Sequence, residues 1–341
     1  MTIPAADVVA DAVCPICGGR STARFRRHSL AAAAEHFVPR GRDPIRRERL
    51  EGVLHRLWDG RDSVDVRRCA SCGFGFASPN VAGDRDFYNL VSNGDPHYPG
   101  DRWEFTRTIA ELADLSGLRG DLLECGAGDG AFLERLRSSP AGARFTPMAT
   151  EYDEGALRRL RAAGFAGSDR SITELGDDCD GRFTVICMFQ TLEHIADAHA
   201  VFDAFRRVGR PGSHVFASVP NAAAIDLQER LARYWDMPPN HVGRWLPACF
   251  TSIAAAHGLE LVSCEIEPVS RLRQAWKFAV YQVNGQAYDP RSVAGRINAI
   301  ESRLVRGPLK RLLAALLFMR LFVALREPPG DSLWVHLRNA D

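Results

Sequence analysis

Four cysteines form the clearest chemical pattern in the chain. They stand in two Cys-x-x-Cys-Gly segments, Cys14–Gly18 and Cys69–Gly73. Each segment can direct two thiolates at one ion, while its glycine lets the backbone curl tightly behind them. Four soft ligands with no open position predict a closed, structural zinc site formed by Cys14, Cys17, Cys69 and Cys72. The long stretch between the two segments, residues 18–68, must then form an inserted hairpin or helices.

A glycine-rich turn follows a short apolar run near the middle of the chain. It reads Glu-Cys-Gly-Ala-Gly-Asp-Gly over residues 124–130, and helical spacing begins directly after it. The glycines also fit a dinucleotide fingerprint, but a pyrophosphate here would meet the carboxylates of Glu124 and Asp129. A ligand with an amino group and a sulfonium suits these carboxylates better. S-adenosylmethionine has both and lacks phosphate, and bare glycine backbone lets it approach closely.

A second group of residues is placed to bind a nucleoside. Glu151 ends the next predicted strand, where its carboxylate can bind both ribose hydroxyls. Residues 169–172 follow a third strand, where backbone groups and a flat contact from Ile172 would hold adenine. Phe87 and Tyr88 are expected to cap this pocket from outside. The full set of predicted cofactor-binding residues is Glu124, Gly126, Ala127, Gly128, Gly130, Glu151, Tyr152, Ser171, Ile172, Phe189 and Gln190.

Two histidines are candidate bases for methyl transfer. The acceptor must lie behind the sulfonium, and a hydroxyl or acidic carbon must also lose a proton. Imidazole titrates near neutral pH, which favours His241, in a turn-rich segment expected to fold over the sheet, ahead of His194. Glu193 is expected to position His194, which has the alternative role of a helix-start residue bonded to backbone. Three aromatic residues either line the acceptor pocket or pack its lid: Tyr234, Trp235 and Trp245.

These residues need a parallel sheet whose carboxyl ends meet at one edge. Apolar runs predict strands at 122–125, 145–150, 165–168, 183–189, 214–219 and 259–266, with an antiparallel last strand at 332–337. The predicted fold class is α/β, a Rossmann-like doubly wound seven-stranded sheet with a small N-terminal zinc-binding module and a helical insertion near the C-terminus. The expected segments are 1–82 for the zinc module and its arginine-rich insert, 83–118 for a linker and lead-in helix, 119–225 for the cofactor-binding core, and 226–341 for the lid, acceptor-site elements, insertion and closing strands.

Composition limits the partners that the chain can have. With 43 basic and 42 acidic residues its net charge is +1, so no global electrostatic attraction to nucleic acid is expected. The arginine-rich insert is either a surface for an anionic substrate or a solvated face balanced by its own acids. Nine cysteines without a signal peptide indicate a reducing location, so the protein is expected in the cytoplasm.

The most apolar stretch is residues 312–325. Arg320 interrupts it, and it is shorter than the ~20 residues that a membrane span needs, so no transmembrane segment is predicted. Its apolar residues lie on nearly all sides of a helix, which favours burial or a homodimer face over peripheral contact with a membrane.

Residues 103–221 resemble class I S-adenosylmethionine-dependent methyltransferases. The similarity rests on the glycine turn, Glu151, Leu192–Ile195, Arg210–Gly212 and Val219–Asn221. Cysteine segments before such a domain are similar to bacterial methyltransferases of sugars and other small biosynthetic intermediates, including deoxysugar C-methyltransferases with an N-terminal zinc module. Pro238–His241 followed by Trp245 is also similar to that group. The resemblance implies a small-molecule acceptor and favours a sugar, nucleotide sugar or glycan intermediate.

The chain departs from its relatives near the predicted base. In ubiquinone-pathway O-methyltransferases a Glu-x-x-Glu-His segment is thought to hold a divalent ion, and Gln190 stands at the first acid here. Only Glu193 and His194 remain, so no catalytic magnesium is expected. Two other functions stay open at this stage: an NAD-dependent oxidoreductase, which the carboxylates of the turn disfavour, and a zinc-bearing nucleic-acid-binding protein with a non-catalytic Rossmann-like fold. Whether oxygen, nitrogen or carbon is methylated stays open too.

Overall fold

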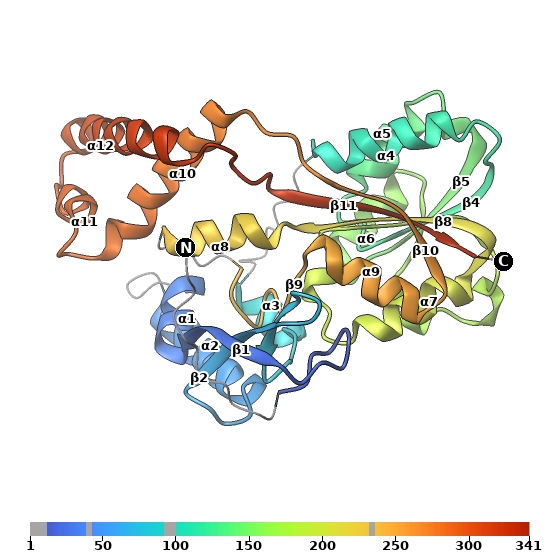
Figure 1. Cartoon of the computed structure of the whole chain (residues 1–341), viewed down its shortest axis with the longest axis horizontal. Helices are drawn as coiled ribbons and strands as arrows, with labels where there is room; N and C mark the ends of the chain where they lie inside the picture. Colours follow the sequence, from blue (N-terminus) through green and yellow to red (C-terminus); the bar gives the residue numbers. More distant parts are fainter. Residues whose placement is uncertain (1–11, 39–42, 92–99, 232–235, 341) are drawn as a thin grey trace. The chain divides into compact units, whose positions relative to one another are not determined.

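The computed structural model describes residues 12–38, 43–91, 100–231 and 236–340. Their contacts divide the chain into two compact units (Figure 1). The first comprises Met1–Pro220, Met237–Glu265 and Ser332–Asp341, and the second comprises Asn221–Asp236 and Ile266–Asp331.

The first unit contains the predicted seven-stranded sheet, in the order β10-β11-β8-β7-β4-β5-β6. The strands are β4 (Gly120–Cys125), β5 (Phe145–Thr150), β6 (Ala166–Ser168), β7 (Phe183–Phe189), β8 (Gly209–Pro220), β10 (Leu259–Ile266) and β11 (Ser332–Asn339). Neighbours from β6 to β8 pair in parallel, and β11 pairs antiparallel with β8. The α/β fold class and the antiparallel last strand are confirmed.

Helices cover both faces of this sheet because its central strands are apolar on both sides. On one face Leu122 and Cys187 pack with residues of α4 (Trp103–Asp114), α5 (Ala131–Arg137) and α6 (Glu154–Ala162). On the other, Leu123 and Met188 pack with α7 (Ala198–Val208) and α9 (Pro247–Ala256). Successive side chains of a strand point to opposite faces, so a continuous apolar run is what a doubly covered strand requires. Short 3₁₀ helices lie at Gly142–Arg144, Ile172–Glu174, Asp177–Cys179 and Leu192–His194.

A four-stranded sheet carries the cysteine segments. Its order is β1-β2-β3-β9, with strands β1 (Thr22–Ser29), β2 (Ser63–Cys69), β3 (Gly75–Ser78) and β9 (Gly243–Arg244). The stretch between the cysteine segments forms the hairpin β1–β2 with helices α1 (Leu30–Phe37) and α2 (Pro44–Leu57) inside it, as predicted. Helix α3 (Arg85–Val91) follows. Because β3 pairs with β9, this sheet also uses residues that follow the large sheet's fifth strand.

Two arginines of the insert, Arg27 and Arg47, form ion pairs. Arg47 is buried and donates to Glu35 and Glu51, at 2.7 and 2.9 Å, and Arg27 donates to Asp65 at 2.6 Å. These pairs support the interpretation of a solvated face whose arginines are balanced by acids of the same module. Two of the three acids lie far from their arginines in the sequence: Glu35 is 12 positions from Arg47, and Asp65 is 38 positions from Arg27.

The second unit is helical. It contains α8 (Ala222–Arg230), α10 (Arg271–Gly285), a 3₁₀ turn (Gln286–Tyr288), α11 (Val293–Asn298) and α12 (Arg303–Ala324). Of the two favoured alternatives for the stretch 312–325, burial within the chain is wrong, since Ala314 is the single buried residue of α12. Composition reveals the apolar residues of a helix but not whether a neighbour covers them. None of the described helices combines the length and apolar character needed to cross a bilayer.

Candidate active site

The glycine turn joins β4 to α5, and its three glycines leave the backbone there without side chains. Gly126, Gly128 and Gly130 have φ values of +70°, +55° and +81°, which only glycine adopts readily. A Cβ on Gly126 would lie 2.5 Å from the Thr191 hydroxyl at the end of β7, and one on Gly130 would lie 2.6 Å from the Leu160 side chain. The turn is therefore packed so closely that side chains are excluded at both positions.

Glu124 places a buried carboxyl at this turn. Its side chain is 3% exposed, and its Oε2 atom has no hydrogen-bond partner among the described residues. Burial, followed by the nearby charge of Glu151, raises the pKa of Glu124 well above its usual value. A buried carboxyl with an unused oxygen fits a cationic group such as the amino group of a bound ligand.

The second predicted carboxylate, Glu151, also meets the turn. Its Oε2 accepts a hydrogen bond from the Gly128 amide at 2.7 Å and its Oε1 accepts one from Asp153 at 2.8 Å. Burial raises its pKa. Asp129, by contrast, forms an ion pair with Arg159 at 2.6 Å. The charge argument for a cationic ligand therefore depends on Glu124 and Glu151 more than on Asp129.

The remaining residues that were predicted to bind adenosine differ in their exposure and in their contacts. Tyr152 is 63% exposed, whereas Ile172 is buried in the core cluster that includes α7. The Ser171 hydroxyl bonds to the Glu174 carboxylate at 2.9 Å. The ring of Phe189 packs on Phe132, with centroids 4.8 Å apart, and its carbonyl accepts a hydrogen bond from the Thr191 hydroxyl at 3.0 Å.

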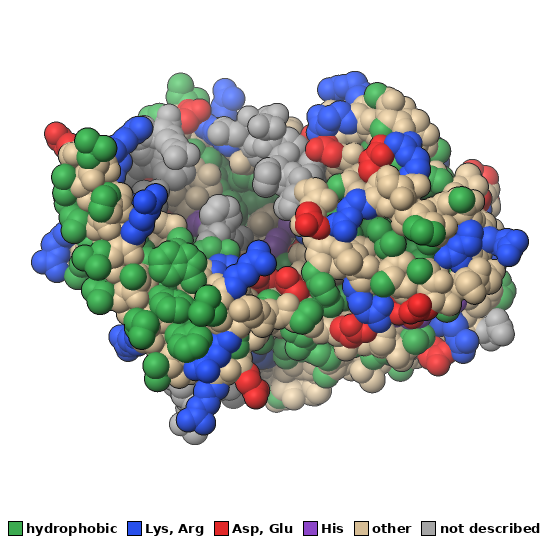
Figure 2. All heavy atoms as spheres, turned by 90° about the horizontal axis from the view of Figure 1, so that it is seen from above, with side chains coloured by type: hydrophobic (Ala, Val, Ile, Leu, Met, Phe, Trp, Pro, Cys, Tyr) green, Lys and Arg blue, Asp and Glu red, His purple; other side chains and the backbone are tan. Residues whose placement is uncertain are grey.

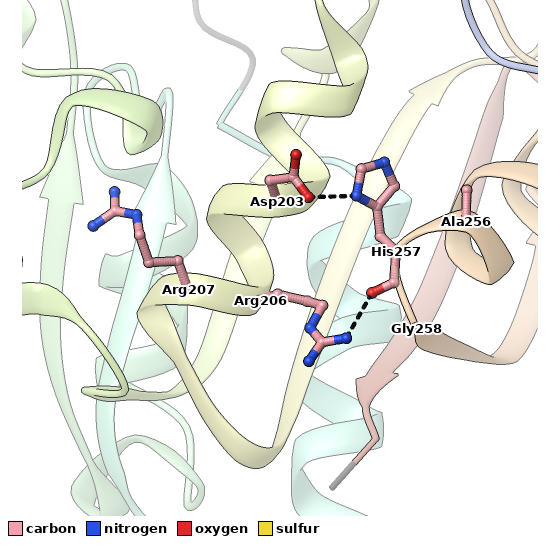
Figure 3. Close-up of a pocket in the computed structure, with 6 residues that line it drawn as sticks. All are labelled: Asp203, Arg206, Arg207, Ala256, His257 and Gly258. Atoms are coloured by element: carbon pink, nitrogen blue, oxygen red, sulfur yellow. Dashed lines mark hydrogen bonds and ion pairs between the residues drawn. The ribbon is translucent and has the colours of Figure 1, made fainter.

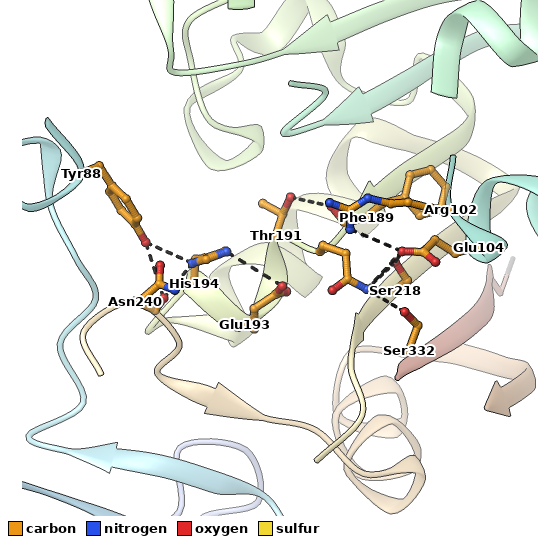
Figure 4. Close-up of polar contacts among 11 residues, drawn as sticks. Tyr88, Arg102, Glu104, Phe189, Thr191, Glu193, His194, Ser218, Asn240 and Ser332 are labelled. Carbon is orange, nitrogen blue, oxygen red and sulfur yellow. Dashed lines mark hydrogen bonds and ion pairs between the residues drawn. The ribbon is translucent and has the colours of Figure 1, made fainter. Parts of the chain in front are cut away.

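The end of β7 meets a polar cluster, in which Figure 4 labels Glu104, Ser218 and Ser332. Gln190 has φ of +50°, a conformation rare for residues other than glycine and common at functional sites. Its Nε2 atom donates to Glu104 at 3.2 Å and lies 3.4 Å from the hydroxyls of Ser218 and Ser332. Strands β7, β8 and β11 thus present polar groups together at their ends.

Glu104 was not identified from the sequence. It is 2% exposed, lies on α4, accepts from Ser218 at 3.3 Å, and has the Arg102 guanidinium 3.6 Å away. The signal was available, because this carboxylate shares a helix face with the buried Thr108 and Leu112. A charged group on the apolar face of an amphipathic helix is rarely buried without a partner or a function.

The two candidate bases lie in contact. The rings of His194 and His241 meet edge-on, with centroids 4.6 Å apart. His194 Nδ1 lies 2.7 Å from the Asn240 carbonyl oxygen and 3.1 Å from the Tyr88 hydroxyl, and its Nε2 lies 3.9 Å from the Glu193 carboxylate (Figure 4). The predicted residues Glu193, His194 and His241 are thus brought together, and Tyr88 from α3 joins them.

The Asn240 carbonyl assigns the tautomer of His194. A carbonyl oxygen only accepts, so Nδ1 carries the proton of this bond and Nε2 is the basic nitrogen of a neutral ring. The segment stays in place because the Val242 amide donates to the Glu193 carbonyl at 2.9 Å. His194 is therefore bonded to backbone, as one of its two predicted roles requires, with a basic nitrogen turned to Glu193.

The same three side chains lie close enough together to share a cation. One ligand atom each from Glu193, His194 and His241 lies within 4.8 Å of the others. From the sequence, only Glu193 and His194 remain of the ligands that a metal site would have here. The fold brings His241 beside them from a distant segment.

Some predicted aromatic contacts have other roles. Trp245 is buried against Phe74 and Phe250, with ring centroids 4.8 Å away in each case, so it packs the interior. Tyr234 and Trp235 lie outside the described residues.

The four cysteines fit a tetrahedral ion. All four Sγ atoms lie within 4.8 Å of one another, and the pairs Cys14–Cys72 and Cys17–Cys69 are both 3.6 Å apart. Zn–S bonds of about 2.3 Å would put sulfurs roughly 3.8 Å apart, close to this spacing. The Ser71 amide donates to Cys69 Sγ at 3.3 Å, and a Cβ on Gly19 would lie 3.2 Å from two of the sulfurs.

A surface pocket of about 470 Å³ lies elsewhere, between α7 and α9 (Figure 3). There His257 bonds to Asp203 at 2.7 Å and to His199 at 2.6 Å, and His199 reaches the Ile16 carbonyl at 3.1 Å. This series of hydrogen bonds links the first cysteine segment to helices α7 and α9, which cover the large sheet. None of the candidate cofactor or base residues lines the pocket.

Comparison with known proteins identifies the domain. Residues 101–264 match the family model described as "Methyltransferase domain". Over 117 residues the chain is 32% identical to a ubiquinone biosynthesis O-methyltransferase of Pseudomonas aeruginosa, an alignment that covers 33% of this chain and 49% of that protein. The chain thus spans about half the length of the curated relatives that it matches. Residues 101–264 are thus similar to a methyltransferase domain, as the motifs predicted, and this match disfavours the dehydrogenase and nucleic-acid-binding alternatives.

Solved structures give weaker likenesses. A SAM-dependent methyltransferase of Archaeoglobus fulgidus is 14% identical, with a TM-score of 0.44 over 74% of this chain and 99% of that one. The 1,6-didemethyltoxoflavin-N1-methyltransferase of Burkholderia thailandensis, solved with S-adenosylhomocysteine, is 13% identical, with a TM-score of 0.41 over 71% of this chain and 80% of that one.

Proposed function

We propose that this protein transfers a methyl group from S-adenosylmethionine to a small biosynthetic acceptor. The observation that carries the proposal is the buried carboxyl of Glu124, with an unused oxygen, beside a turn that excludes side chains. Because the glycines carry no side chains, a ligand can approach the backbone of the turn closely. The carboxyl favours a ligand with a cationic group over one with a phosphate.

Each part of the cofactor has candidate partners in this chain. The bare turn and Glu124 would bind the methionine end, Glu151 the ribose, and residues near Ile172 the adenine. When bound, the cofactor supplies a methyl group on a positively charged sulfur. Glu151 must exchange its bond to the Gly128 amide for the ribose hydroxyls, or share it with them.

The histidine pair is proposed to remove the acceptor's proton. His241 would accept the proton of an acceptor hydroxyl, while a bound cofactor would supply the methyl group. His194, with its tautomer held by Asn240, contacts His241 from the side. Its basic Nε2 atom faces Glu193, which stabilises a positive charge on His194 should that ring be the base instead.

The acceptor class rests on the relatives. The matched proteins are named as O-methyltransferases of ubiquinone biosynthesis, which supports a hydroxyl as the methylated group. The cysteine module and the segment around His241 support a sugar, nucleotide sugar or glycan intermediate. A second part of the proposal is one structural zinc ion held by the four cysteines. That none of the nine cysteines forms a disulfide fits a location in the cytoplasm.

A radiolabelled cofactor assay tests the proposal. The full chain is incubated with methyl-labelled S-adenosylmethionine and separate pools of nucleotide sugars, free sugars and phenolic hydroxyl compounds. We expect label in one hydroxyl-bearing pool, dependent on His241 or His194. Label transferred in no pool, with no cofactor bound, would contradict the proposal, and label in the phenolic pool alone would replace the sugar acceptor.

A further inference from the structure

Helix α12 of the second unit carries an exposed apolar stripe. It consists of Val305, Leu312, Leu316, Met319 and Val323, with exposed fractions that include 64% for Leu316 and 71% for Val323. Their separations of seven, four, three and four residues place all five on one face of the helix. Single exposed apolar residues are ordinary, but an aligned row over several turns is a docking surface.

The packing of α12 uses its opposite side. Ala314 is buried with Val283 of α10 and Ala294 of α11, and Leu313 and Leu317 pack against the same cluster. Phe318 also meets Trp276 of α10, with ring centroids 6.0 Å apart. The stripe is therefore not the face that holds the unit together.

Charge around the stripe has one sign. Residues 291–326 contain eight Lys or Arg and one acid, Glu301, a net charge of +7 in a chain whose total is +1. At about 100° per residue, Arg320 lies about 70° and Arg311 about 110° around the helix from the centre of the stripe, on opposite sides. Figure 2 shows hydrophobic side chains with Lys and Arg around them over α12.

We propose that α12 lies on an anionic lipid surface, with its stripe in the headgroup boundary and Arg311 and Arg320 at the phosphates. An exposed apolar face rimmed by cations is the pattern of a helix that binds in the plane of a membrane. A second copy of the chain is a poorer occupant, because a symmetric contact would bring two strongly positive helices together. This docking is independent of the methyl-transfer site.

Vesicle sedimentation with the full chain tests this proposal. We expect binding to vesicles of phosphatidylcholine mixed with phosphatidylglycerol, little binding to phosphatidylcholine alone, and release by salt. Leu316→Glu combined with Met319→Glu should abolish binding. Arg311→Gln and Arg320→Gln should each weaken it about fivefold, since each cation near the surface contributes on that order.

Val262→Glu provides the matched control. Val262 is also exposed, at 45%, but lies on β10, so this variant should bind like the parent. Light scattering after size exclusion distinguishes a second copy. No binding to anionic vesicles, unchanged binding of the double glutamate variant, or a parental dimer that this variant converts to monomer would each overturn the proposal.

Discussion

The rings of His194 and His241 meet edge-on, with their planes at 82° and their centroids 4.6 Å apart. Two imidazoles at this distance do not both carry a positive charge readily, because each charge disfavours the other. We therefore expect at most one of the two rings to be protonated at a time. The contact joins a segment after β7 to a segment before β9, so it depends on the fold.

Removing the imidazole of His241 should slow turnover far more than it weakens cofactor binding. We expect His241→Ala to lower kcat by about 10²–10⁴-fold, the usual contribution of a positioned base. The affinity for S-adenosylhomocysteine, measured by calorimetry, should change little. His241→Gln keeps the volume and serves as the control for packing. Full activity in both variants would transfer the role of base to His194, and His194→Ala would then show the larger loss.

Adding one methyl group at Gly126 should damage the cofactor site. The new Cβ would stand 2.5 Å from the Thr191 hydroxyl in a residue with φ of +70°. Gly164→Ala is the matched control, because Gly164 has φ of +85° and no atom within 4 Å of its Cβ position. Both variants should lose about 1 kcal/mol of stability from backbone conformation. Cofactor binding should be lost in Gly126→Ala alone, and equal binding in the two would refute the close packing of the turn.

Glu124→Gln should stabilise the protein without ligand at neutral pH and weaken cofactor binding. The folded state raises the pKa of Glu124, so the folded protein holds its proton at pH values where the unfolded chain releases it. The wild type therefore loses stability as pH rises from about 4.5 toward the raised pKa, and the amide does not. Melting temperatures at pH 5 and pH 8 check this: the variant's advantage should appear at pH 8. A smaller advantage at pH 8 than at pH 5 would contradict the sign.

Metal analysis should find one zinc ion per chain. Cys69→Ser should release it and lower the melting temperature, because four sulfurs held 3.6 Å apart in pairs need a shared cation. Cys264→Ser, which alters a cysteine outside the cluster, is the control and should keep the metal. Gly19→Ala should weaken metal binding, since its Cβ would crowd Cys17 and Cys69. Purified protein that is free of metal and equally stable would exclude the zinc site.

Much of the fold was predictable because local patterns determine it. The bounds of β5, β7 and β10 match the predicted ones, since apolar and alternating runs are visible in a short window. The pairing of β3 with β9 was not, because it joins residues more than 160 positions apart and β9 has only two residues.

The site was predictable residue by residue but not in its contacts. The glycine turn requires its residue types locally, so Gly126 and Glu124 could be identified. The partners of Asp129 and His194, which are Arg159 and Tyr88, come from distant segments, and no spacing rule indicates them. The expectation that residues 312–325 are buried within the chain failed for a related reason, because an apolar sequence does not show which neighbour covers it.

Titration calorimetry of the full chain with S-adenosylhomocysteine and, separately, with NAD tests the central claim most directly. We predict saturable binding of one S-adenosylhomocysteine per chain, weakened in Glu124→Gln, and no heat from NAD. Binding of NAD with no response to S-adenosylhomocysteine would contradict the account.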